Sequence, residues 1–192
     1  MRKIGRICIV LGCLLIAGSL ALFLTMQVGT AQAQRCNAQV VQRIGGILPP
    51  LQPGIRDAYI DMTMPVLELD GTDYAALLDI PALGLTLPVA DVWDKGTVRQ
   101  QPCRFSGTVY DGSLIIGGSD RAGQFSGFDR MQPGNEVSVT DMTGTVFSYV
   151  VDRIDRASSA SAAVLTAGES DLTLFVRDAY GLEYILLRCV VK

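Results

Sequence analysis

The stretch DLTLFVRDAYGLEYILLRCVV, residues 171–191, contains two short apolar runs that decide the class of the fold. The runs DLTLFVRD and YILLRCVV are rich in Leu, Val and Ile, and Ala179-Tyr180-Gly181 lies between them. Apolar runs of this length bounded by turn residues are typical of buried β-strands. We therefore predict two strands at the C-terminal end of the chain.

The same pattern continues toward the N-terminus. EVSVTD and TVFSYVVDRI alternate apolar and polar residues around Met142-Thr143-Gly144, which predicts a hairpin. SLIIGG, AALLDIP, LGLTLPVA and the segment 64–69 predict further short strands, whereas GQFSGFDRM and SSASAAVLTAG predict short helices. Strands this short, at this spacing, favour an all-β domain closed or nearly closed into a barrel.

The first third of the chain differs in composition from the rest. No charged residue lies between Ile7 and Gln34, and about 20 apolar residues are enough to cross a bilayer as a helix. Arg2, Lys3 and Arg6 precede this run, and such residues stay on the cytoplasmic side. We predict a single-pass anchor that leaves the domain outside the cell. A cleaved signal peptide, ending at Ala31-Gln32-Ala33, is the alternative, and it also exports the domain.

These observations divide the chain into four parts. Residues 1–6 form a cytoplasmic tail and residues 7–28 the transmembrane anchor. Residues 29–73 form a stalk and arm, in which residues 34–44 could continue the helix before the Gly- and Pro-rich residues 45–54. Residues 74–192 form the β-barrel domain.

Composition excludes several classes of function. The chain has 192 residues and a net charge of −3, without the clustered basic face that nucleic-acid binding needs. It contains no histidine, the usual side chain for proton transfer near neutral pH. Any mechanism that requires an imidazole is therefore excluded, as is a zinc site with a histidine ligand.

Four blocks in order resemble the sortase family, with class B or D as the nearest type. They are DIPALGLTLPV (79–89), CRFSGTVYDGSLIIGGS (103–119), FDRMQPGNEVSVTDMTGTVFSYVV (128–151) and DLTLFVRD with YILLRCVV (171–191). The resemblance implies an eight-stranded β-barrel behind an N-terminal transmembrane helix, on the bacterial cell membrane. It also implies an enzyme that cuts a sorting-signal peptide and joins it to an amine, using a cysteine nucleophile, a histidine acid and an arginine for the oxyanion.

All three catalytic positions of the family are occupied here by other residues. Ser119 stands where the resemblance places the histidine, and Arg177 stands where it places the cysteine. The family arginine falls at Tyr184, or at Glu183 after a slip of one residue. Because a guanidinium stays protonated and Ser119 has no imidazole to activate it, the family mechanism is not expected. Ser119, Arg177, Tyr184 and Glu183 are candidates for a peptide-binding groove. For Arg177, however, the preferred prediction is an ion pair with Asp178 or Glu183, and binding of an acidic group is the alternative.

The other cysteines offer no clear replacement for the nucleophile. An exported domain lies in an oxidising compartment, so Cys103 and Cys189 are predicted to form a disulfide, with two separate buried thiols as the alternative. Scattered acidic residues lack the spacing of a calcium loop, so no metal or cofactor is predicted; they are Asp111, Asp120, Glu136 and Asp141.

Two main hypotheses follow from the sequence. The first is a membrane-anchored sortase homologue without catalytic activity that binds a sorting-signal peptide, a pilin-like subunit or an active sortase. The alternative is an active cysteine transpeptidase or hydrolase with an atypical nucleophile. A purely structural module of the envelope is a third possibility.

Overall fold

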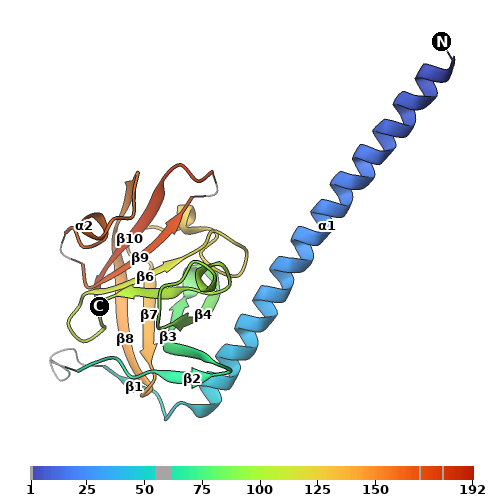
Figure 1. Ribbon diagram of the computed structural model, residues 1–192. Helices are drawn as coiled ribbons and strands as arrows, with labels where there is room; N and C mark the ends of the chain where they lie inside the picture. The colour runs from blue at the N-terminus through green and yellow to red at the C-terminus, as the bar shows by residue number, and fades with distance from the viewer. Residues whose placement is uncertain (1, 55–61, 169, 179) are drawn as a thin grey trace.

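The structure is a computed structural model that describes residues 2–54, 62–168, 170–178 and 180–192. Within the first helix, α1 (Arg2–Ile47), it describes side chains for residues 12–20 and 34–47. Figure 1 shows α1 projecting from a β-barrel, which it meets only near its C-terminal end.

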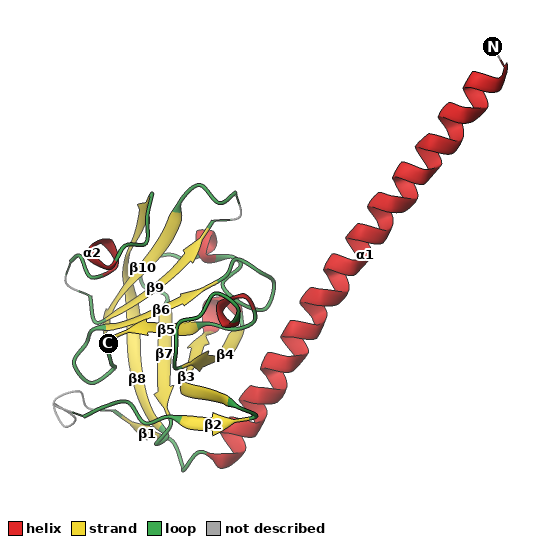
Figure 2. Ribbon diagram, viewed as in Figure 1, coloured by secondary structure: helices red, strands yellow, loops and turns green. Residues whose placement is uncertain are grey.

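Eight strands close the barrel, and Figure 2 shows them in yellow. In spatial order they are β3 (Thr72–Ile80), β4 (Leu85–Ala90), β5 (Cys103–Ser106), β6 (Leu114–Gly118), β9 (Leu172–Arg177), β10 (Tyr184–Val191), β8 (Thr145–Ala157) and β7 (Glu136–Asp141). The ring closes because β7 pairs with both β8 and β3. The predicted eight-stranded barrel is therefore confirmed.

Strands outside the ring and short helices complete the domain. β1 (Gln52–Pro53) pairs with β8, and β2 (Leu67–Leu69) pairs with β3. The predicted short helices appear as η4 (Phe128–Arg130) and α2 (Ala162–Leu165), and two further 3₁₀ turns are η2 (Pro81–Leu83) and η3 (Thr97–Arg99). The sequence did not predict β5 or β1 as strands.

α1 runs without interruption through the predicted anchor, residues 7–28, and the predicted stalk helix, residues 34–44. Its end is docked on the barrel because Ile44 is fully buried against Leu69 and Tyr74. Within the described part of the chain, no helix combines the length and hydropathy required to cross a bilayer. The membrane location of residues 7–28 thus stays a prediction.

The strands alternate between the barrel interior and an outer face. Leu172, Leu174 and Val176 of β9 belong to the interior core, whereas Phe175 packs in a second apolar cluster on the outer face. This alternation follows from the two-residue period of a strand. Odd-numbered residues of β9, including Arg177, therefore share the outer face.

The predicted hairpin turn between β7 and β8 is organised by a buried carboxylate. Oδ1 of Asp141 accepts hydrogen bonds from the backbone N–H groups of Thr143 and Thr145 at 2.8 and 2.9 Å. Its Oδ2 accepts one from the hydroxyl of Tyr110 at 2.7 Å. Gly144 has φ of +83°, a left-handed conformation that glycine adopts without steric cost. The turn thus fixes the register of the strand pair that closes the barrel.

Candidate functional site

Strand register brings together, at one end of the barrel, the three residues that the resemblance places at catalytic positions. β6 and β9 are parallel, with Gly118 opposite Val176, so Ser119 leaves β6 beside the end of β9. β9 and β10 are antiparallel, with Arg177 directly opposite Tyr184. The Cζ atom of Arg177 lies 5.8 Å from the centroid of the Tyr184 ring, a cation–π distance. Ser119, Arg177 and Tyr184 are therefore neighbours, although they lie far apart in the sequence.

Four aromatic side chains form a pocket beside Arg177, which we call the aromatic pocket. Its rings belong to Trp93, Phe105, Phe175 and Tyr184, and its volume is about 270 Å³. The Trp93 ring centroid lies 5.5 Å from that of Phe105 and 5.3 Å from that of Phe175. Offset and edge-on contacts at these distances stabilise aromatic clusters. Arg177 thus supplies a positive charge at the side of an apolar cavity.

Glycine at position 117 allows Trp93 to lie against the backbone of β6. A Cβ atom built on Gly117 would come within 2.2 Å of Cζ3 of Trp93 and 2.5 Å of Cζ of Phe175. The loop that carries Trp93 is held in place by an ion pair between Asp91 and Arg104 at 2.5 Å. The floor of the aromatic pocket therefore depends on a residue without a side chain and on a part-buried ion pair.

A buried arginine holds the loop that borders the aromatic pocket on another side. We call this loop, residues 158–168 with α2, the strap. Arg188 of β10 donates hydrogen bonds to the carbonyl oxygens of Leu165 at 2.5 Å and Val164 at 2.7 Å. It also donates to Oγ1 of Thr173 at 3.0 Å and to Oδ2 of Asp155 at 3.1 Å. Arg188 therefore pins the strap to the outer face.

The predicted ion pair between Arg177 and a neighbouring carboxylate is wrong. Oδ1 of Asp178 instead accepts hydrogen bonds from the backbone N–H groups of Leu182 and Glu183 at 2.7 and 3.2 Å. Glu183 forms an ion pair with Arg156 at 3.5 Å and does not line the aromatic pocket. Among the described residues, no carboxylate lies within 4.0 Å of the Arg177 guanidinium.

Ser119 has no partner that could activate it as a nucleophile. Its backbone N–H donates to Oε1 of Gln124 at 3.1 Å, and its carbonyl accepts from the N–H groups of Arg121 and Phe125. Its hydroxyl oxygen is buried and has no hydrogen-bond partner within the described ranges. The position at which the resemblance expects an acid thus carries an isolated hydroxyl.

The predicted disulfide between Cys103 and Cys189 is wrong, because both are free thiols. β9 and β6 lie between the strands that carry them. Three strand spacings place the two cysteines roughly 14 Å apart along the sheet, whereas a disulfide needs Cα atoms within about 7 Å. Burial raises the pKa of the Cys103 thiol to about 11 and that of the Cys189 thiol to about 12.

The acidic residues considered for calcium are dispersed. Asp111 caps its own turn by accepting from Ser113, Asp141 organises the β7–β8 turn, and Glu136 pairs with Lys192. Burial raises the pKa of the fourth, Asp120, and so does repulsion from nearby carboxylates. Across the described ranges, no group of three potential ligand side chains could hold a metal ion.

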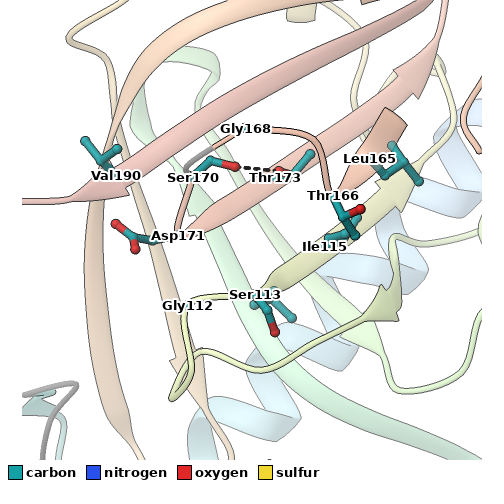
Figure 3. Close-up of a pocket in the computed structure, with 11 residues that line it drawn as sticks. Gly112, Ser113, Ile115, Leu165, Thr166, Gly168, Ser170, Asp171, Thr173 and Val190 are labelled. Carbon is teal, nitrogen blue, oxygen red and sulfur yellow. Dashed lines mark hydrogen bonds between the residues drawn. The ribbon is translucent and has the colours of Figure 1, made fainter. Parts of the chain in front are cut away.

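A larger pocket of about 560 Å³ lies at the opposite ends of β6 and β9. Figure 3 shows its mixed polar and apolar lining. In it the hydroxyl groups of Ser170 and Thr173 form a hydrogen bond, with their oxygen atoms 3.1 Å apart. None of the predicted site residues lines this pocket. The aromatic pocket, in contrast, contains Arg177 and Tyr184.

Sequence reasoning missed the residues that shape the aromatic pocket. Trp93 and Phe105 come from a loop and from the unpredicted strand β5, so no local pattern joined them to Arg177. Arg188 left a usable signal, because it is a single charge inside the apolar run YILLRCVV. A charged residue at such a position is buried only when it is paired.

Comparison with known proteins agrees with this fold. The family model of the sortase domain matches residues 78–180, which is more than half of the chain. Sortase C1 from Streptococcus agalactiae has a TM-score of 0.57 and 16% identity, over 88% of this chain and 97% of that chain. Sortase A from Corynebacterium diphtheriae has a TM-score of 0.54 and 18% identity, over 85% and 84%.

A Clostridium perfringens sortase D5 transpeptidase has a TM-score of 0.53 and 21% identity, over 62% of this chain and 79% of that chain. Because the sequence identities are this low, these structural matches demonstrate a shared fold and nothing further. No curated protein matches the chain.

Proposed function

Because this chain belongs to the sortase family, we propose that it is a catalytically inactive member that binds a peptide on the outer face of its barrel. The proposal rests on the residues that stand at the three positions to which the resemblance assigns catalysis. Ser119, Arg177 and Tyr184 meet at one end of the barrel, beside a pocket built for apolar groups. The site retains a place for a ligand while the reacting groups are absent.

Chemistry supports the inactive assignment. Transpeptidation by the family route, as the resemblance describes it, needs a thiolate and an imidazole, and the chain contains no histidine. A guanidinium at position 177 cannot attack a carbonyl, because it stays protonated. Cys103 and Cys189 are fully buried, and their raised pKa values leave almost no thiolate near neutral pH.

The pocket supports peptide binding. Ligand sites are commonly concave and lined by aromatic side chains, with a few polar groups that orient the ligand. Here the aromatic rings provide apolar walls, and Arg177 provides the polar group. A sorting-signal peptide, a pilin-like subunit or an active sortase could present such a segment, since sortase-family proteins act on peptides of this kind.

Membrane display is part of the proposal. Residues 7–28 carry no charge, and Arg2, Lys3 and Arg6 precede them. The full-length chain is expected to remain in the membrane fraction of its host after extraction with alkaline carbonate. Its intact mass distinguishes the anchor from the alternative, since cleavage after Ala33 would release a chain that begins at Gln34.

Fluorescence of Trp93, the sole tryptophan of the chain, reports on the pocket directly. The test uses the full-length chain in phospholipid bicelles and a tryptophan-free sorting-signal peptide that carries a thiol-reactive warhead. We expect a saturable change in Trp93 emission without a covalent adduct in the intact mass. Tyr184→Ala should weaken binding, whereas Tyr180→Ala, an exposed tyrosine outside the aromatic pocket, should not.

Two results would contradict the proposal. A covalent adduct at Cys103 or Cys189 would favour the active transpeptidase or hydrolase with an atypical nucleophile. No change in Trp93 emission with any sorting-signal peptide would favour a structural module.

A further inference from the structure

The charges around the aromatic pocket indicate the chemical class of its ligand. We infer that the aromatic pocket and Arg177 together bind the free C-terminal carboxylate of a peptide whose last residue is apolar. This inference rests on the proposed peptide-binding function and specifies what the pocket recognises.

The Arg177 guanidinium is available to a ligand anion. It is exposed, and no described carboxylate lies within ion-pair distance. The two acidic neighbours expected to neutralise it are engaged elsewhere, Asp178 with backbone N–H groups and Glu183 with Arg156. A cation at the side of an apolar cavity, with its neighbouring carboxylates already occupied, is complementary to an incoming carboxylate.

Tyr184 prepares the guanidinium for such an anion. The Cζ atom of Arg177 lies over the Tyr184 ring, 5.8 Å from its centroid, which is a cation–π contact that holds the guanidinium at the side of the aromatic pocket. A guanidinium has five N–H donors in a planar fork, and an arginine binds a carboxylate through two parallel hydrogen bonds. A lysine could offer only a point charge at this position.

Pocket size favours a chain terminus over an acidic side chain. A volume of about 270 Å³ accepts one or two apolar side chains. In a C-terminal residue the carboxylate is bonded to the same Cα atom as the side chain, so an apolar group can enter the pocket while the carboxylate stays beside Arg177. An internal Asp or Glu would have to place its own side chain at Arg177 and carry its backbone onward.

The carboxylates beyond Arg177 disfavour a ligand that carries further negative charge past this residue. An adjacent pocket of about 310 Å³, the acidic pocket, is bordered by three carboxylates and one arginine, Arg156, whose charge is paired with Glu183. The three carboxylates are Asp120, Asp129 and Asp178. Repulsion among these carboxylates adds to burial in raising the pKa of Asp120. A ligand with its single negative charge at its end fits this arrangement, because the charge stops at Arg177 and does not extend into the acidic pocket.

Matched peptides test the inference in the Trp93 fluorescence assay with the full-length chain in bicelles. The probes are acetyl-Gly-Ser-Gly-Ser-Leu-Leu with a free carboxylate, the same peptide as a C-terminal amide, and an amide with an internal Glu before the two leucines. We expect the free acid to bind about tenfold more tightly than either amide, the factor for one charge-assisted contact.

Variants of Arg177 separate recognition of the carboxylate from binding in general. Arg177→Ala should remove the difference between acid and amide, and Arg177→Lys should restore part of it, because lysine keeps the charge and loses the paired geometry. Arg130→Ala, an exposed arginine that does not line the pocket, is the control and should behave as the unmodified chain.

The outcomes distinguish this inference from the proposed function. Equal affinities for acid and amide, or an unchanged preference in Arg177→Ala, would overturn the inference while peptide binding still stands. Tight binding of the internal-Glu amide would overturn it in favour of an acidic side chain. If none of these peptides changes Trp93 emission, the inference fails, and the proposed function fails with it only if the sorting-signal peptide also leaves the emission unchanged.

Discussion

Replacement of Arg188 by methionine should loosen the strap and change the aromatic pocket from a distance. The guanidinium is almost fully buried, and it donates to two strap carbonyls, to Thr173 and to Asp155. Methionine keeps most of the apolar stem of the side chain and removes every donor. Leu165, which packs on Phe175, would then lose the hydrogen bond that holds its backbone to β10.

The loss in the free energy of unfolding can be estimated from the groups that Arg188→Met leaves without hydrogen-bond partners. Each buried carbonyl that loses its donor costs about 1 kcal/mol or more. Breaking a fully buried ion pair costs about 3–5 kcal/mol, but Asp155 is 40% exposed and water screens its share. We therefore expect Arg188→Met to lower the free energy of unfolding by about 3 kcal/mol, which lowers the Tm by about 6–12 °C for a chain of this length.

Arg153→Met is a matched control, because Arg153 is the cross-strand partner of Arg188 and also lies near Asp155, at 3.6 Å. It is 41% exposed, so its removal should cost less than about 0.5 kcal/mol. Thermal unfolding followed by circular dichroism measures both variants, and Trp93 emission measures the pocket. Equal shifts in Tm for the two variants, or unchanged Trp93 emission in Arg188→Met, would refute the role of the strap.

Four further predictions follow from the local surroundings of single residues. Ser119→Ala should leave stability unchanged or raise it by up to about 1 kcal/mol in urea denaturation, because the buried hydroxyl has no described partner to lose; a clear loss of stability would contradict this. Gly117→Val should destabilise the fold by about 1–3 kcal/mol and shift Trp93 emission to the red, since the new side chain must displace that ring; an unchanged spectrum would argue against the packing. Exposed Cys36 should react with a maleimide at pH 8 while buried Cys189 reacts only after unfolding, as mapped by peptide mass spectrometry. Because the folded pKa of Cys189 is raised to about 12, its contribution to stability is complete below about pH 9 and is lost as the pH rises toward 12; stability that rises over this range would contradict the sign.

Most of the barrel could be predicted because its strands are apolar runs bounded by turns. β9, β10 and the β7–β8 hairpin coincide with such runs. β5 was missed because CRFS has only four residues, so its alternation of apolar and polar residues is too short to indicate a strand. Its place in the ring depends on pairing with β6 and on a single pair with β4, which are long-range interactions that no local pattern encodes.

The arrangement of the site could be predicted only for those residues whose strands could be placed in order from the sequence. The meeting of Ser119, Arg177 and Tyr184 followed from the ordered blocks that gave the family resemblance. The disulfide failed because cysteine number and compartment do not say how many strands separate Cys103 from Cys189. The ion-pair partners of charged side chains could not be predicted from the sequence either. Glu183 lies close to Arg177 in the sequence, yet it forms an ion pair with Arg156.

The three residues that the resemblance places at catalytic positions are compatible with one another in physical terms. Arg177 and position 184 are direct cross-strand neighbours, so an arginine at both would place like charges opposite each other, which is destabilising. Tyrosine at 184 replaces this repulsion with a cation–π contact. An imidazole at position 119 would have added a further positive charge next to Arg177 whenever it was protonated, whereas serine adds none. With arginine at position 177, tyrosine at 184 and serine at 119 thus limit the positive charge at this end of the barrel to one guanidinium, which is what the proposed binding of a single carboxylate requires.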